Sequence, residues 1–364
     1  MQPFIPHKLP VTELDWEKLV VLIGKATELV SLYNGLLKSI PNANILLSAI
    51  TTQEAVLSSR IEGTQASLSD VYKFEASGYC PNKKNGDIGE IINYRRTLFR
   101  AMELFEKIPN IHLNMLKELH LILLSGTRGS NKALGEFRRV QNFIGVYGAT
   151  IEQATYVPPS PENVLPALDA WEKYINSNEQ QVLVQSAVLH AQFEIIHPFL
   201  EGNGRLGRIL IPLFFYQKGL LREPVFYVSK YLEEHRDDYY QKLRAITQNG
   251  DWQSWIEFFL QVIIEQARVN VNKAENILDL YKKTMKQIKE LTHSSYIMET
   301  LNALFQKPIF SVEEFMANAT IKYKSTALDI LKKLEFDHII ENIREGRGRV
   351  ASIYAFSELI DITE

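Results

Sequence analysis

Residues 197–208, HPFLEGNGRLGR, place a histidine, a carboxylate, a Gly-Asn-Gly turn and two arginines within twelve residues. Glycine and asparagine tolerate unusual backbone angles, so the N–H groups of Gly202, Asn203 and Gly204 can point into one concavity at the start of the next helix. Helix N-termini favour anions, and two arginines three residues apart on a helix share a face from which both reach phosphate oxygens. The spacing therefore predicts a site for a phosphate chain.

The other groups of this stretch can act on a bound phosphate chain. Arg205 and Arg208 would hold its oxygens. Glu201 lies at the mouth of the turn, where a carboxylate beside a polyphosphate works through Mg²⁺. His197 precedes Pro198, which disfavours helical geometry at the histidine, and an imidazole with an ordinary pKa of about 6.5 can accept a proton near neutral pH. Together these residues predict phosphoryl or nucleotidyl transfer with His197 as general base.

The elements that must position these groups are mostly helical. Apolar residues recur at helical spacing over 14–36, 45–62, 89–107, 112–124, 162–176, 180–196, 205–218, 233–248 and 251–266. Gly63 is placed to end the second of these helices, and Ser67 with Asp70 is placed to cap a short helix that follows. Residues 125–161 are rich in glycine and end in prolines, and their β-type runs at 141–146 and 150–157 predict a β-hairpin.

The C-terminal part has a different pattern. Residues 267–294 read as a charged helical connector, and 295–364 read as a separate unit with helices at 296–305, 312–317 and 325–335 followed by two β-rich runs. This order predicts a winged-helix domain. It carries 8 Lys and Arg against 11 Asp and Glu, so DNA binding through the locally basic wing at 344–349 is not favoured over a protein contact.

The overall composition is that of an ordinary globular protein, with 46% hydrophobic and 23% charged residues among 364. The net charge of −3 gives no indication of a nucleic-acid or membrane surface. A single cysteine, Cys80, excludes an internal disulfide and fits a cytoplasmic location. The N-terminus lacks a signal-peptide pattern, and no uninterrupted apolar run of about 18 residues occurs, so we expect no spanning helix and no membrane partner.

The stretch 197–208 resembles the Fic (Fido) family motif, His-x-Phe-x-(Asp/Glu)-Gly-Asn-Gly-Arg-x-x-Arg, at every defined position. The resemblance implies a mainly α fold, with a Fic-type helical core and a β-hairpin flap. The chain then divides into an N-terminal helical region (1–110), a Fic catalytic core (111–266), the connector (267–294) and the winged helix (295–364).

The same resemblance implies a protein adenylyltransferase, which transfers AMP from ATP to a Ser, Thr or Tyr hydroxyl of a protein and releases pyrophosphate. It makes His197 the base, Glu201 the Mg²⁺ ligand and Phe199 the anchor of the loop. Gly202, Asn203, Gly204, Arg205 and Arg208 become the residues that bind the phosphates.

A second stretch, SSRIEG at residues 58–63, resembles the inhibitory pattern of the family, (Ser/Thr)-x-x-x-Glu-(Gly/Asn), through Ser58, Glu62 and Gly63. The resemblance implies that the Glu62 carboxylate pairs with Arg208 and takes the place of the ATP γ-phosphate. ATP bound beside it would have its α-phosphate misaligned for attack, and a small misplacement costs a large factor in rate. The chain is therefore expected to inhibit itself in cis.

Two further segments resemble parts of the family. GEFRR (135–139) and YVPPSP (156–161) bracket the flap, which in relatives pairs with the target protein as an added strand, and Thr155 with Tyr156 is expected on its nucleotide-facing edge. Tyr239 and Tyr240 lie where relatives line the adenine pocket, and Thr247 follows two helical turns after Tyr239. The two tyrosines could equally be core residues.

Several functions stay open at this point. The site could remove AMP from a modified protein, transfer a phosphate or another nucleotide, or only sense ATP for a transcriptional regulator. The expected partners are ATP, Mg²⁺ and a protein substrate, and apolar patches on the N-terminal helices could support a homodimer. The remaining histidines, among them His112, His120 and His190, form no HxxxH or HExxH spacing, so no zinc site is expected.

Overall fold

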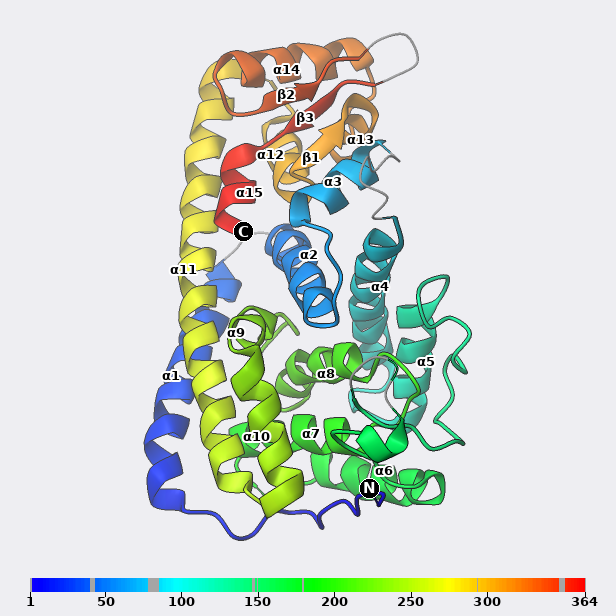
Figure 1. The fold of residues 1–364 in the computed structure, drawn as a ribbon. Coiled ribbons are helices and arrows are strands. Elements are labelled where there is room, and N and C mark those ends of the chain that lie inside the picture. Colours follow the sequence, from blue (N-terminus) through cyan, green and yellow to red (C-terminus); the bar gives the residue numbers. More distant parts are fainter. Residues whose placement is uncertain are drawn as a thin grey trace.

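The computed structural model describes residues 2–39, 43–77, 85–145, 148, 150–178, 180–292, 294–346 and 351–363. Cys80 and residues 347–350 of the predicted wing lie outside this description. Helices dominate the described chain, as predicted (Figure 1). The helices that precede the first strand are α1 (Trp16–Ser39), α2 (Ala43–Ile61), α3 (Leu68–Ser77), α4 (Asn85–Lys107), α5 (Leu113–Leu124), the 3₁₀ turn η1 (Ile151–Gln153), α6 (Pro161–Ile175), α7 (Val182–Ile196), α8 (Asn203–Gln217), α9 (Ser229–Glu234), α10 (Arg236–Asn249), α11 (Trp252–Thr292) and α12 (Ile297–Gln306).

α7 and α8 form the buried centre of the fold. Nearly every side chain of α7 is buried, and it has apolar residues on all sides, as expected of a helix surrounded by others. α6, α10 and α11 pack on α7, while α2, α4 and α5 pack on α8. The loop 197–202, which joins these two helices, is therefore held between rigid walls.

Local signals place the ends of several elements. α2 ends at Ile61, and Gly63 follows it with a φ of 101°, a conformation that glycine adopts without strain. α3 begins after a reciprocal cap in which the Asp70 N–H donates to Ser67 Oγ at 3.1 Å and the Ser67 N–H donates to the Asp70 carboxylate at 2.9 Å. α7 ends at Ile196, directly before His197 and Pro198. These boundaries agree with the predictions.

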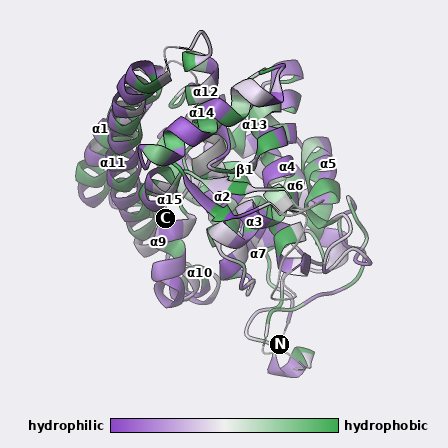
Figure 2. Ribbon diagram, turned by 90° about the horizontal axis from the view of Figure 1, so that it is seen from above, coloured by the Kyte–Doolittle hydropathy of each residue, from purple (hydrophilic) through white to green (hydrophobic). Residues whose placement is uncertain are grey.

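α11 is one continuous helix of 41 residues and covers both the helix expected at 251–266 and the helical connector expected at 267–294. The segment expected to be a charged connector buries an apolar side that includes Ala267, Ala274, Ile277 and Ile288, so it is packed along its length. α1 lies beside the first half of α11 in two views, and both helices alternate between hydrophobic and hydrophilic turns (Figures 1 and 2). Residues Trp16–Lys38 of α1 would be long and apolar enough to cross a membrane by length and composition alone.

The C-terminal part continues after α12 with β1 (Ile309–Ser311), α13 (Val312–Asn318), α14 (Lys324–Phe336), β2 (Glu341–Arg344), β3 (Ile353–Ala355) and α15 (Ser357–Thr363). The strands form an antiparallel sheet in the order β1-β3-β2. Ala355 of β3 pairs with Ile309 on one side and Glu341 on the other. This part is not isolated, because β1 contacts α3, and both α12 and α15 contact α2 (Figure 1).

The predicted hairpin within residues 125–161 is irregular in the structure. Among the described residues of this segment, one antiparallel bridge joins Ile144 to Tyr156, and η1 lies between the two. Val146, at the end of the first expected run, lies outside the described residues. The extended N-terminal segment meets the second leg, where the Phe4 N–H donates to the Val157 carbonyl at 3.0 Å. The flap is thus held by backbone contacts near its base rather than by a regular ladder.

Candidate active site

A cavity of about 660 Å³ opens between the end of α7, the start of α8 and α10, with the flap on another side. This volume is ordinary for a site that holds a small molecule. The predicted residues that line it are Glu62, Thr155, Tyr156, His197, Glu201, Gly202, Asn203, Gly204, Arg208, Tyr239, Tyr240 and Thr247. Ser58, Gly63 and Arg205 do not belong to this lining. The fold therefore brings residues from α2, the flap, α8 and α10 to one place.

His197 lies at the C-terminal end of α7 in the left-handed conformation, with φ 48° and ψ 59°. Its Nδ1 lies 3.3 Å from the carbonyl oxygen of Glu194, which can only accept a hydrogen bond. Nδ1 is therefore the protonated nitrogen and Nε2 carries the lone pair. Burial lowers the pKa of His197 to about 4. The imidazole is neutral at neutral pH and can act as a base.

The side chains of Asn203 and His120 hold the loop that follows His197. Asn203 Oδ1 accepts from the Phe199 N–H at 2.9 Å, and Asn203 Nδ2 donates to the Phe199 carbonyl at 2.8 Å. His120 stacks on the Phe199 ring, with centroids 3.8 Å apart. His120 Nδ1 accepts from the Gly135 N–H, so its Nε2–H donates to the Glu201 carbonyl at 3.0 Å. The Asn203 side chain thus holds the loop in place through two hydrogen bonds. The sequence predicts only that the backbone N–H of Asn203 binds phosphate.

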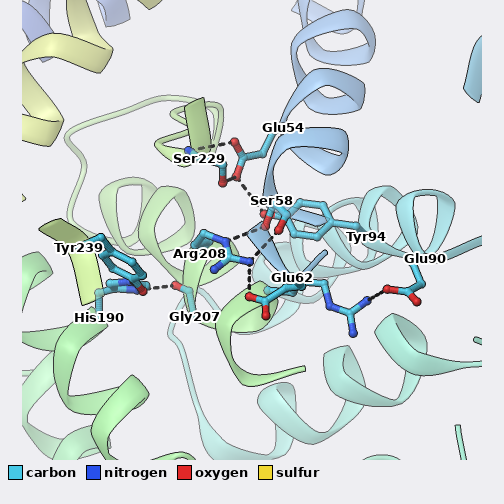
Figure 3. Close-up of polar contacts among 11 residues, drawn as sticks. Glu54, Ser58, Glu62, Glu90, Tyr94, His190, Gly207, Arg208, Ser229 and Tyr239 are labelled. Carbon is cyan, nitrogen blue, oxygen red and sulfur yellow. Dashed lines mark hydrogen bonds and ion pairs between the residues drawn. The ribbon is translucent and has the colours of Figure 1, made fainter. Parts of the chain in front are cut away.

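Glu62 and Arg208 form an ion pair in the cavity wall, with Glu62 Oε1 2.8 Å from the Arg208 guanidinium (Figure 3). Ser58 completes the contact, because Arg208 Nε donates to Ser58 Oγ at 2.8 Å and a terminal nitrogen donates to the Ser58 carbonyl at 2.9 Å. Glu62 Oε1 also lies directly over Gly204, where an added Cβ would collide with it. The carboxylate therefore occupies the N-terminus of α8, the place where an anion is expected.

The charges of this pair stabilise each other. Although burial acts to raise the pKa of the Glu62 carboxyl, the Arg208 guanidinium lowers it below its ordinary value. Burial acts to lower the pKa of Arg208, and Glu62 raises it. The Arg208 side chain is only 1% exposed, whereas that of Glu62 is 33% exposed. Glu62 can therefore leave into the cavity, while Arg208 stays fixed in the wall.

Arg205 and Arg208 have different partners. The Arg205 guanidinium forms a buried ion pair with Glu90 of α4 at 2.8 Å, and Arg128 approaches the same carboxylate at 3.4 Å. Burial raises the pKa of Glu90 despite these two cations. In this conformation Arg205 contacts a carboxylate of the protein rather than the cavity where the phosphates are predicted.

The far wall of the cavity is aromatic. Tyr239 is almost fully buried, and its hydroxyl meets His190 Nε2 at 3.0 Å. His190 Nδ1 donates to the Gly207 carbonyl at 3.2 Å, so the tyrosine hydroxyl donates to Nε2. Tyr240 lies 5.0 Å from Tyr239, ring to ring, and Thr247 donates its hydroxyl hydrogen to the Arg244 carbonyl. Tyr239 is thus both a core residue and part of the cavity wall.

Glu201 lines the cavity, and its carboxylate makes no hydrogen bond or ion pair with the residues that the structure describes. The loop before the flap packs closely on its side chain, since an added Cβ at Gly129 would collide with it. A carboxylate without a partner among the described residues, beside the predicted phosphate site, fits the prediction of a Mg²⁺ ligand.

Two buried carboxyl groups near the site carried no recognised sequence signal. Glu54 lies two turns before Glu62 on α2, accepts from Tyr94 at 3.1 Å and from the Ser229 N–H at 3.3 Å, and burial raises its pKa to about 7. Glu194 lines the cavity one turn before His197, and burial raises its pKa to about 8. The 54, 58, 62 spacing on α2 could have indicated a shared helix face.

Comparison with known proteins identifies the family. The Fic/DOC family model matches residues 92–215, and the Fic/DOC family N-terminal model matches residues 20–103. The chain belongs to the Fic/DOC family. A Fic family protein from Desulfovibrio desulfuricans G20 has a similar fold, with a TM-score of 0.58 at 20% identity over 98% of each chain. Fic-1 from C. elegans gives a TM-score of 0.52 at 20% identity, over 71% of this chain and 72% of that one.

Curated relatives share modest sequence identity. The protein adenylyltransferase Fic of Nematostella vectensis is 26% identical over 253 residues, which are 68% of this chain and 54% of the relative. A probable protein adenylyltransferase of Aquifex aeolicus is 28% identical over 196 residues, 52% of this chain and 56% of the relative. The chain spans about half the length of these two relatives. The predictions of the family and of a mainly α Fic fold are confirmed.

Proposed function

We propose that this protein is an adenylyltransferase that moves AMP from ATP to a hydroxyl group of a protein and holds itself inactive through Glu62. The observation that carries the proposal is that a neutral histidine, whose Nε2 carries the lone pair, shares one cavity with Arg208 and the N-terminus of α8. The relatives named as adenylyltransferases support the same chemistry.

In the proposed reaction the ATP phosphates bind at the N-terminus of α8, where backbone N–H groups and Arg208 face the cavity. His197 Nε2 accepts the proton of the attacking hydroxyl while its oxygen bonds to the α-phosphorus. The bond from that phosphorus to the bridging oxygen breaks, and pyrophosphate leaves. Positioning and charge stabilisation account for most of such catalysis.

Glu201 is the residue that would hold Mg²⁺, and the ion would neutralise charge on the phosphates. Tyr239, Tyr240 and Thr247 line the part of the cavity proposed for the adenine base, where aromatic faces suit a purine. Thr155 and Tyr156 lie on the flap at the cavity edge, and a target segment would bind along that flap by backbone hydrogen bonds.

Inhibition follows from competition for one place. Glu62 occupies the α8 N-terminus and one terminal nitrogen of Arg208, both of which a terminal phosphate needs. ATP that enters beside Glu62 must place its phosphates elsewhere, which misaligns the α-phosphorus. The C-terminal part supports a winged-helix interpretation through its order of helices and strands, and its acidic balance supports a protein partner. A cytoplasmic location fits the single cysteine.

The test is incubation of the purified protein with Mg²⁺ and either α-labelled or γ-labelled ATP, followed by denaturing electrophoresis. Retention of the α-label alone is the expected result, and mass spectrometry then locates AMP on the protein itself. Retention of the γ-label would instead mean phosphorylation. The absence of both labels from the wild type and from the Glu62→Gly variant would contradict the proposal and favour an ATP sensor.

A further inference from the structure

Arg138 is a buried cation near the site that pairs with no carboxylate among the described residues. Its residue surface is 3% exposed, and burial lowers the pKa of its guanidinium to about 10, so it remains charged at neutral pH. A buried unpaired charge is strongly unfavourable unless hydrogen bonds replace its lost water. Its neighbour Arg139 lies on the surface and pairs with Glu136 at 3.2 Å.

The hydrogen bonds of Arg138 go to the end of α7. Its backbone N–H donates to the Pro198 carbonyl at 2.9 Å, Nε donates to the His197 carbonyl at 2.9 Å, and a terminal nitrogen donates to the Ile196 carbonyl at 3.3 Å. The last carbonyls of a helix lack partners within it, and the negative end of the helix dipole favours a cation. Arg138 therefore satisfies three consecutive carbonyls centred on the catalytic histidine.

The same guanidinium reaches both legs of the flap. One terminal nitrogen donates to the Pro159 carbonyl at 2.5 Å, and the other lies 3.5 Å from the Val140 carbonyl. A second contact between the flap and α7 lies nearby, where the Tyr156 hydroxyl donates to the Ile195 carbonyl at 2.8 Å. The flap and the end of α7 are thus joined through Arg138.

His197 needs such support because its backbone is in the left-handed region, with φ 48°. Residues other than glycine adopt this conformation at functional sites only where the surroundings impose it. The orientation of the imidazole depends on it, since Nδ1 meets the Glu194 carbonyl across the same turn.

We propose that Arg138 is a positioning residue for the transfer reaction. It holds the backbone of His197 in the left-handed conformation and fixes the flap at one distance from the base. A target hydroxyl presented by the flap then meets Nε2 at a constant spacing. This inference rests on the transferase activity proposed above.

The test compares Arg138→Met and Arg138→Lys with the matched control Arg139→Met, all in the Glu62→Gly background so that turnover is measurable. The side chain of Arg139 is 86% exposed, so its replacement leaves the site untouched. We expect Arg138→Met to lower kcat about 10- to 100-fold, the scale of a small misplacement, with the KM for ATP changed less than about threefold. Arg138→Lys keeps the charge but not the several hydrogen-bond donors, so its kcat is expected to lie between those of the parent and Arg138→Met. The kcat of the control Arg139→Met is expected to stay within about twofold of the parent value.

A second readout keeps the inference testable if Arg138→Met folds poorly. In the ¹⁵N-histidine spectrum of Arg138→Lys, we expect the ring signals of His197 to move while those of the buried His190 stay in place. An increase in the KM for ATP at unchanged kcat, or unmoved His197 signals, would overturn the inference. If the Glu62→Gly parent transfers no AMP at all, the proposed function fails, and the spectrum still decides whether Arg138 positions His197.

Discussion

Replacement of Glu62 by glycine is expected to activate the protein, and the structure sets the size of the effect. The carboxylate makes one charge-assisted hydrogen bond to Arg208, and such bonds contribute about 1.5–3 kcal/mol. Because the Glu62 side chain is 33% exposed, the lower part of this range applies, about 1.5–2 kcal/mol. At about 1.4 kcal/mol per factor of ten, removal of the competitor favours productive ATP binding by about 10- to 30-fold.

The assay is incorporation of α-labelled AMP into the protein itself or into added protein, at fixed Mg²⁺ and ATP. Glu62→Gln keeps the size of the side chain but loses the charge, so its AMP incorporation is expected to lie between that of the wild type and that of Glu62→Gly. Glu106→Gly, at an exposed position in the last turn of α4, is the matched control for a Glu-to-Gly change at a helix end and is expected to leave incorporation unchanged. Incorporation by Glu62→Gly at or below the wild-type level would refute the reasoning.

Three further predictions concern the same site. His197→Ala is expected to abolish transfer while ATP still binds, as measured by calorimetry, and retained transfer would remove His197 from the base role. Gly204→Ala places a methyl group too close to the position of Glu62 Oε1, where a phosphate oxygen is proposed, so it is expected to weaken ATP binding at least tenfold even with Glu62→Gly. Unchanged affinity would argue against phosphate binding there. Burial lowers the pKa of His120 and His197 to about 4 and that of His190 to about 3. As the pH falls, the unfolded chain therefore binds protons at these side chains at a higher pH than the folded chain does. Burial also raises the pKa of Glu54 to about 7 and that of Glu194 to about 8, so the folded chain keeps these protons where the unfolded chain has lost them. The free energy of unfolding is therefore expected to fall as the pH drops from about 6.5 toward 4, through the histidines, and to fall again as the pH rises toward 8, through the two carboxyl groups. A urea-denaturation profile without a maximum near pH 6.5 would contradict this.

Much of the fold was predictable because its signals are local. The helical spacing, the Ser67 and Asp70 cap and the stop before Pro198 act on neighbouring residues, and each appears where it was expected. The packing of the second half of α11 was not, because charged residues on its exposed side hid the apolar stripe that it buries.

The candidate site also contains residues that short local patterns predicted and residues whose roles depend on distant partners. The contiguous stretch 197–208 supplied seven residues of the cavity lining, and Glu62 came from a second short pattern. The orientation of Arg205 depends on Glu90, 115 residues away, and the support of His197 depends on Arg138, 59 residues away. Pairings over such separations leave no periodic signal in a single sequence. Glu54, His120 and His190 were missed for the same reason, because their roles arise only from tertiary contacts.

Glu62 directly follows α2, and this helix also packs against α12 and α15. Lys273 of α11 strengthens that junction, since its ammonium group donates to Gln53 of α2 at 2.7 Å and to the Thr363 carbonyl at 2.9 Å. Two sites that share one helix are thermodynamically linked whenever the helix shifts. Consider a partner that binds the C-terminal part more tightly when α2, and Glu62 with it, is displaced. Such a partner would raise the affinity of the site for ATP, and by reciprocity ATP would raise the affinity for that partner by the same factor.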